Sequence, residues 1–176
     1  AKLAVNYSDD PSLIATAGPV DALLLSLNNP VPAEARKAVF DHVASGRGLV
    51  ILHAGNWFNW ADWKEFNNQL VTGGTRGHDN YGEFEVAIVD ASHPVTQGVP
   101  ATFTIRDELY NFIPDEKGAE RHVLATAKSP KSGKVFPIVW VTKNDKARVV
   151  CNTLGHDGAA RSNPAYQALL KNSLTW

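Results

Sequence analysis

Two histidines each stand directly behind an apolar run of the chain. His53 follows the run 48–52, and His156 follows the run 147–154 with only Gly155 between them. Short apolar runs bounded by glycines are typical of strands that are buried on both faces. Open α/β sheets bind their ligands at the carboxyl ends of such strands. We therefore predict that His53 and His156 line one site, with their side chains within about two hydrogen-bond lengths of each other or joined by a shared water or metal ion.

A carboxylate is expected to complete this site. Glu108 and Tyr110 share one face of a strand because side chains alternate, whereas the adjacent Asp107 faces away unless the strand ends there. Histidines with a carboxylate and without an obvious nucleophile favour proton transfer or metal-assisted chemistry. We assign catalytic roles to His53, Glu108 and His156. A solvated edge strand would explain Glu108 and Tyr110 equally well.

Metal binding is the second kind of chemistry that these residue types allow. Imidazole and carboxylate groups are ligands for zinc or a similar divalent ion, and His53 and His156 are the candidate ligands. The sequence has no short His-x-x-x-His spacing, so a metal site would have to be assembled from distant segments. The residues alone leave the cofactor open.

Three side chains are candidates for substrate binding: His78, Trp57 and Tyr110. His78 follows the glycine-rich segment 73–77, which lacks the strand and helix of a phosphate-binding loop and can equally be a plain turn. Trp57 opens a group of aromatic residues whose rings can stack on the C–H faces of sugars, although such rings more often pack on a neighbouring helix or subunit. That group comprises Trp57, Phe58, Trp60 and Trp63. We expect one of them, Trp57, to reach the site.

The remaining histidines and the only cysteine have structural explanations. His93 precedes Pro94, a pair that is typical of a turn at the start of a rigid connection. His42 and His122 are expected to be packing or surface residues. Cys151 lies inside an apolar run, where a thiol is usually inert packing, and it cannot form an internal disulfide.

The composition of the 176 residues is that of an ordinary globular domain, with 44% hydrophobic and 20% charged residues. The net charge of -1 gives no argument for nucleic acid or an anionic membrane as a partner. No apolar stretch reaches membrane-spanning length, and residues 1–20 lack a signal-peptide pattern. A single cysteine slightly favours the cytoplasm, although a processed exported chain would look the same. A small-molecule partner is favoured, and a homo-oligomer is left open.

Alternating apolar segments predict a single α/β domain over residues 1–176. The strand 21–27, the helix 32–45 and the strand 48–52 are joined by tight links, which predicts a right-handed parallel crossover. The polar residues 143–146 predict a hairpin turn. The other expected elements are strands over 3–7, 83–89, 102–106, 122–126, 136–142 and 148–154, and helices over 61–71 and from 163 onward.

Several motifs match one known family, in that family's order. They are Gly46–Ala54, Val71–Gly74 with Gly77 and His78, His93–Pro100, Asp107–Tyr110, Pro137–Trp140, Thr153–His156 and Asn172–Trp176. The motifs cover nearly the whole chain, which therefore resembles the trehalose-utilisation (ThuA-like) family of the class I glutamine amidotransferase-like superfamily. The resemblance implies a flavodoxin-like three-layer domain with a mainly parallel central sheet. The chain is expected to begin at the family's second strand, without its first strand-helix unit.

The resemblance also implies a role in carbohydrate metabolism, in the processing of oxidised (3-keto) disaccharides or glycosides. A 3-keto group acidifies the neighbouring C–H, so one histidine could remove that proton while a second histidine or a metal ion polarises the ketone. In the amidotransferases the strand matching residues 49–52 leads to a nucleophilic cysteine. His53 stands there instead, so amidotransferase chemistry is not expected. A non-catalytic carbohydrate-binding or regulatory domain on the same fold is the alternative.

Overall fold

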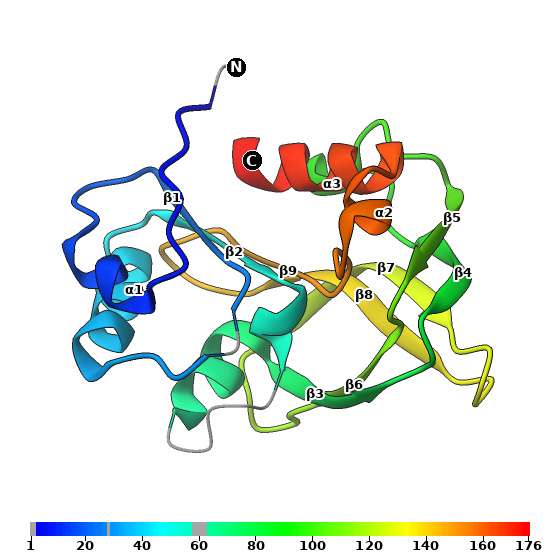
Figure 1. Ribbon diagram of the computed structural model, residues 1–176, viewed down its shortest axis with the longest axis horizontal. Coiled ribbons are helices and arrows are strands. Elements are labelled where there is room, and N and C mark those ends of the chain that lie inside the picture. The colour runs from blue at the N-terminus through cyan, green and yellow to red at the C-terminus, as the bar shows by residue number, and fades with distance from the viewer. Residues whose placement is uncertain (1–2, 28, 58–62) are drawn as a thin grey trace.

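The computed structural model describes residues 3–27, 29–57 and 63–176, and this part of the chain forms two sheets. The larger sheet has seven strands in the order β1-β2-β9-β8-β7-β4-β5, and the smaller one pairs β3 with β6 (Figure 1). The strands are β1 Ala22–Leu25, β2 Gly48–Leu52, β3 Gly73–His78, β4 Gly82–Ile88, β5 Thr102–Asp107, β6 Tyr110–Pro114, β7 Arg121–Lys128, β8 Val135–Thr142 and β9 Val149–Asn152. The helices are α1 Ala33–Ala44, α2 Gly158–Arg161 and α3 Pro164–Thr175, with a π-helix at Phe66–Val71 and 3-10 turns at Pro11–Thr16, His53–Asn56 and Pro94–Thr96.

The strands β1, β2 and β9 form the parallel part of the large sheet. The chain passes from β1 through α1 to β2, which confirms the expected strand-helix-strand crossover. The helix α1 begins after Pro32, and the chain leaves it at Gly46, which adopts a φ of +86° that favours glycine. The strand β2 lies between β1 and β9 and pairs in parallel with both. Residues 49–52 are buried, as the unbroken apolar run predicts for a strand covered on both faces.

The other half of the large sheet is antiparallel. The pairs β9-β8, β8-β7, β7-β4 and β4-β5 all run in opposite directions. The expectation of a mainly parallel sheet therefore holds for β1, β2 and β9 and not for the remaining pairings. For β7-β8 and β8-β9 the physical reason is the length of the connections: the segments 129–134 and 143–148 contain no helix, and short links can join only antiparallel neighbours. The turn expected at 143–146 does connect the hairpin β8-β9.

Helices cover both faces of the large sheet, so the expected α/β class and its three layers are confirmed. One core cluster packs α1 and the π-helix against one face, with Val39, Phe66 and Trp140 among its buried members. A second cluster packs α3 against the other face through Tyr166 and Leu169 (Figure 1). No helix in the described part of the chain is long and apolar enough to cross a membrane.

Two expected elements differ in the structure. The segment 3–7 is not a strand, because Leu3, Val5 and Tyr7 stay exposed and pair with no neighbouring strand in the described residues. In place of the helix expected over 61–71, the structure has a π-helix at Phe66–Val71. Residues 61 and 62 of the expected helix lie outside the described chain. Alternation alone does not make a strand when no partner edge lies beside it.

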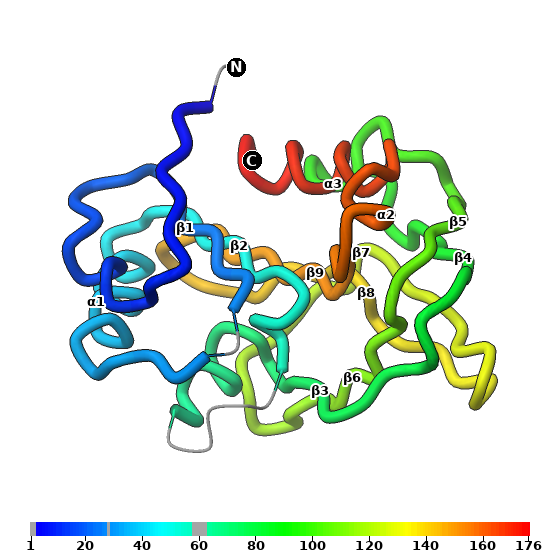
Figure 2. The backbone as a smooth tube through the Cα atoms, in the orientation of Figure 1, coloured from blue at the N-terminus to red at the C-terminus, as the bar shows by residue number. Residues whose placement is uncertain are grey.

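The glycine-rich segment 73–77 is a strand and not a loop. It forms β3, which pairs antiparallel with β6 next to the large sheet; Figure 2 shows the two running side by side. Gly73 is required there, because a Cβ atom at this position would lie 2.3 Å from the Ile113 carbonyl oxygen. Three of its six residues are glycine, which is why its sequence looked like a turn. It brings His78 beside Tyr110, the first residue of β6.

Candidate active site

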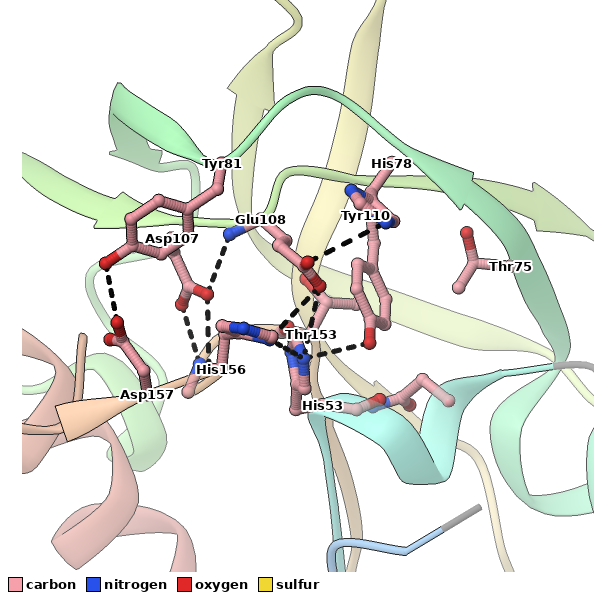
Figure 3. A network of polar contacts seen from close by, with 12 residues as sticks. His53, Thr75, His78, Tyr81, Asp107, Glu108, Tyr110, Thr153, His156 and Asp157 are labelled. Carbon is pink, nitrogen blue, oxygen red and sulfur yellow. Dashed lines mark hydrogen bonds and ion pairs between the residues drawn. The ribbon is translucent and has the colours of Figure 1, made fainter. Parts of the chain in front are cut away.

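Three strand ends meet at one edge of the sheet. His53 follows β2, and the loop with His156 follows β9, its parallel neighbour, so both carboxyl ends face the same way. Glu108 lies between the end of β5 and the start of β6. Figure 3 shows the side chains of all three residues pointing toward one another, with Tyr110 beside them. We call His53, Glu108, Tyr110 and His156 the His53 cluster.

The backbone of His53 adopts a conformation that a residue with a side chain rarely takes. Its φ is +38°, at the turn where β2 passes into the 3-10 turn His53–Asn56. Left-handed backbone at a non-glycine residue is strained and is found most often at functional sites. The amide of Asn56 braces the turn by donating to the carbonyl oxygens of Ile51 and Asn152 at 3.3 and 3.1 Å. The sharp turn projects the imidazole past the end of the strand.

A backbone carbonyl fixes the tautomer of His53. Nδ1 lies 2.8 Å from the carbonyl oxygen of Thr153, and because a carbonyl only accepts, Nδ1 carries the proton and donates. Burial lowers the pKa of His53, an effect that the Thr153 carbonyl partly opposes. The ring is therefore neutral near pH 7, and the unprotonated Nε2 faces the cluster as a hydrogen-bond acceptor.

Three groups surround Nε2 of His53. The Tyr110 hydroxyl lies 3.0 Å from Nε2 of His53 and donates to it. Nδ1 of His156 lies 3.3 Å from the same nitrogen, and Oε2 of Glu108 lies 3.6 Å from it. Burial, followed by the charges of Glu108 and Asp107, raises the pKa of Tyr110, so its phenol stays protonated as a donor.

Glu108 links the two histidines to His78. Its Oε2 lies 3.2 Å from Nδ1 of His156, and its Oε1 lies 3.7 Å from Nε2 of His78. The side chains differ in exposure: 9% for His53, 16% for Glu108 and 43% for His156. The cluster therefore has a buried end at His53 and an accessible end at His156.

The carboxylate of Asp107 organises the site without belonging to the cluster. It is fully buried and accepts backbone N–H bonds from Gly155 at 2.7 Å, Glu108 at 2.8 Å and His156 at 3.1 Å. Burial raises its pKa, and the three N–H donors oppose that rise. Because β5 ends at Asp107, adjacent carboxylates can serve one site from different directions. Sequence reasoning allowed for this strand end but did not identify Asp107.

Gly155 explains how the β9 loop approaches so closely. Its φ is +110°, and a Cβ atom there would lie 2.6 Å from the Tyr166 hydroxyl oxygen. Only glycine fits this position without strain. The loop is held further along by Tyr81, whose hydroxyl donates to Asp157 Oδ2 at 2.7 Å. Neither Tyr81 nor Asp157 stood out in the sequence.

The structure also brings the three substrate-binding candidates to the cluster. The ring centroid of Trp57 lies 5.3 Å from that of Tyr110 and 6.2 Å from that of His78. Trp63 packs instead against Phe66 in the core. Phe58 and Trp60 lie outside the described residues.

The residues given structural roles lie away from the cluster. His42 on α1 contacts the Gly48 carbonyl oxygen at 2.8 Å, and His93 accepts from the Val95 N–H at the start of a 3-10 turn. His122 pairs with Asp90 at 2.8 Å. Cys151 is completely buried in β9, and burial raises the pKa of its thiol, which disfavours the nucleophilic thiolate.

The comparisons with known proteins match this architecture. The family model for trehalose utilisation, ThuA, matches residues 3–176. The chain belongs to the ThuA family. This membership gives the chain a carbohydrate-related role, as the family's description indicates. No protein with a curated description matched the chain.

Solved structures of ThuA-like proteins share the fold. One from Parabacteroides merdae has a TM-score of 0.78 at 25% identity, covering 89% of this chain and 69% of its own. One from Bacteroides uniformis has a TM-score of 0.80 at 23% identity, covering 96% and 74%. The glutaminase domain of Trypanosoma brucei CTPS, with bound acivicin, has a TM-score of 0.55 at 12% identity and covers 99% and 82%. This last likeness confirms the amidotransferase-like fold alone.

Proposed function

We propose that this ThuA-family chain is an enzyme that processes 3-keto disaccharides or glycosides at the His53 cluster. The observation that carries the proposal is the convergence of two imidazoles, a carboxylate and a phenol on one point at the carboxyl ends of β2 and β9. His53, His156 and Glu108 are assigned the catalytic roles. Trp57, His78 and Tyr110 are assigned to substrate binding.

The proposed reaction begins at the carbon next to the ketone. A base removes the proton from C2 of the 3-keto sugar, and the electron pair of that C–H bond forms a C1–C2 double bond as the C1–O bond breaks. The departing oxygen takes a proton and leaves as an alcohol. If water then adds to C1, the net reaction is hydrolysis. If no water adds, the net reaction is elimination.

The cluster's residues suit these proton movements. Nε2 of His53, once the Tyr110 hydroxyl turns from it toward the substrate, accepts the proton itself or holds the group that accepts it. Tyr110, kept protonated by burial, donates a hydrogen bond toward the negative oxygen that develops on the ketone. His156, at the accessible end of the cluster, is assigned the protonation of the leaving oxygen. The rings of Trp57 and Tyr110 offer faces for the sugar.

A chromogenic pair of substrates tests the proposal. A 3-keto glucoside with a nitrophenyl leaving group should release nitrophenol, whereas the unoxidised glucoside should not, because its C2–H bond is not acidified. Exchange of the C2 proton in deuterated water, followed by NMR, reports proton removal separately from bond cleavage. His53→Ala should lower both rates by about 10²-fold or more.

Two control variants keep this test specific. His122→Ala removes an exposed histidine of an ion pair remote from the cluster, and it should leave turnover unchanged. Cys151→Ala should lose some stability through a small cavity and keep its turnover. A folded but inactive Cys151→Ala variant would instead support an amidotransferase-type nucleophile.

A carbohydrate-binding domain is the second candidate, and the aromatic rings of Trp57 and Tyr110 beside the cluster favour it. This reading predicts that the wild-type protein binds the keto-sugar without C2 exchange or nitrophenol release. Such a result, obtained with and without added divalent metal, would rule out the enzymatic proposal.

A further inference from the structure

Three side chains of the cluster direct ligand-type atoms toward one another. With Nδ1 of His53 donating to Thr153, the Nε2 lone pair points toward Oε2 of Glu108 and Nδ1 of His156. These three ligand atoms, one from each side chain, lie within 4.8 Å of one another. In the tautomer of His156 that leaves Nδ1 unprotonated, a carboxylate and two imidazole lone pairs face one another, and they repel unless a proton or a cation lies between them. The hydroxyl of Tyr110 supplies a single proton, and only to His53.

The distances between the ligand atoms fit a small cation. Atoms bound about 2.1 Å from a tetrahedral zinc ion lie about 3.4 Å from one another. The observed separations are 3.3 Å between the two imidazole nitrogens, 3.6 Å from His53 to Glu108 and 3.2 Å from His156 to Glu108. The three atoms therefore form a nearly equilateral triangle of the size that one ion requires.

Contacts behind the ligands hold them in this geometry. His53 donates its other ring N–H to the Thr153 carbonyl at 2.8 Å, the kind of outer contact that orients most metal-binding histidines. The backbone N–H groups of Glu108 and His156 both donate to the buried carboxylate of Asp107. One buried group thus fixes the backbone of two of the three ligands.

We propose that His53 Nε2, Glu108 Oε2 and His156 Nδ1 bind a divalent transition-metal ion of the zinc type. Two imidazoles and one carboxylate suit zinc, cobalt, manganese or iron better than magnesium, which prefers oxygen ligands. Three protein ligands leave a coordination position for water or substrate, as in catalytic zinc sites. That position is accessible from the side of His156, whose side chain is 43% exposed.

The role of the ion rests on the proposed function, whereas its binding does not. A divalent ion polarises a ketone and lowers the pKa of bound water, so it supplies both the electrophile and the base of the proposed proton removal. His53 then acts as a ligand and not as the proton acceptor. Once Nε2 of His53 binds the ion, its lone pair no longer accepts from the Tyr110 hydroxyl, which is then released to donate to the ketone oxygen.

Direct titration of the metal-free protein tests the binding. After removal of metals with a chelator, zinc chloride should bind with a stoichiometry of one ion per chain by calorimetry. Cobalt(II) should give the visible absorption of a low-symmetry site, and magnesium should not compete. The isosteric variant Glu108→Gln and the accessible variant His156→Ala should weaken zinc binding by about 10²-fold or more.

His122→Ala is the matched control, because it removes a histidine that pairs with a carboxylate elsewhere on the surface. Its zinc affinity should equal that of the wild type. The inference is overturned if zinc, cobalt and manganese do not bind, or if Glu108→Gln and His156→Ala bind zinc as tightly as the wild type. Turnover by rigorously metal-free protein would remove the ion's catalytic role and leave the proposed function standing. Metal binding without turnover of the keto-sugar would leave the metal site standing and remove the proposed function.

Discussion

Replacing Asp107 by Asn should destabilise the protein far more than the exchange of one carboxylate oxygen for an amide nitrogen suggests. The buried carboxylate accepts three backbone N–H bonds, from Gly155, Glu108 and His156. Asparagine has only one acceptor oxygen, so at least one N–H would face the new amide's own hydrogens. If the oxygen takes the position of Oδ1, the bond from Gly155 is the one that is lost.

The expected cost follows from these bonds. A hydrogen bond to a charged group contributes about 1.5 to 3 kcal/mol, and an unpaired buried donor costs about 1 to 3 kcal/mol. Against this, the variant no longer buries a charge, and the raised pKa of Asp107 shows that this burial is unfavourable. We expect a net loss of about 3 kcal/mol in the free energy of unfolding, since the lost bond and the unpaired N–H together exceed the relief.

Urea unfolding followed by circular dichroism measures this loss. With an m-value of about 2 kcal/mol/M, the midpoint should fall by about 1.5 M, and the melting temperature should fall by about 6 to 12 °C. Asp145→Asn, at an exposed carboxylate in the β8-β9 turn, is the matched control and should change neither value. Asp107→Asn with wild-type stability would show that relief of charge burial balances the lost bonds, and our reasoning about this site would be wrong.

Two further perturbations test the packing around the sheet. Gly155→Ala should destabilise the fold by about 2 kcal/mol, because its φ of +110° and the 2.6 Å approach to Tyr166 leave no room for a methyl group; a melting curve checks this, and the additional change Tyr166→Phe should recover part of the loss. For His42, burial lowers the pKa in the folded state, so the unfolded chain binds more protons. The contribution of His42 to the free energy of unfolding is therefore complete above its pKa in the unfolded chain, about 6.5, and is lost as the pH falls through its lower pKa in the folded state. His42→Gln should lose less stability than the wild type between about pH 7 and 5 in urea titrations, and equal losses would contradict this assignment.

The sequence predicts where the site lies better than it predicts which residues hold it together. His53 and His156 follow apolar runs that must be buried strands, and neighbouring parallel strands end at one edge, so their proximity could be inferred without coordinates. Alternation along one strand is the wrong argument for pairing Glu108 with Tyr110, because β5 ends at Asp107 and β6 begins at Tyr110, so Glu108 lies in the link between them. The roles assigned to these residues stay predictions until the variants are measured.

Asp107 and β3 could not be read from the sequence, for different reasons. Nothing local marks the residue at which β5 ends, and that ending decides whether Asp107 turns toward the loop of Gly155. The strand β3 begins with glycines at 73 and 74, and its pairing with β6 depends on an edge supplied from elsewhere in the chain. The antiparallel half of the sheet also depends on which distant strands pair, which periodicity within one segment does not encode.

The two histidines lie far apart along the chain, so the cluster forms only in the completely folded domain. His53 and His156 are 103 residues apart in sequence, and they meet only when β2 and β9 pair. Contacts of such high sequence separation form slowly, because a long loop must close first. A fragment that ends before β9 lacks His156, so no such fragment can carry the cluster. Anything that binds across these strand ends would stabilise the whole domain by mass action, and its occupancy would report on the folded population.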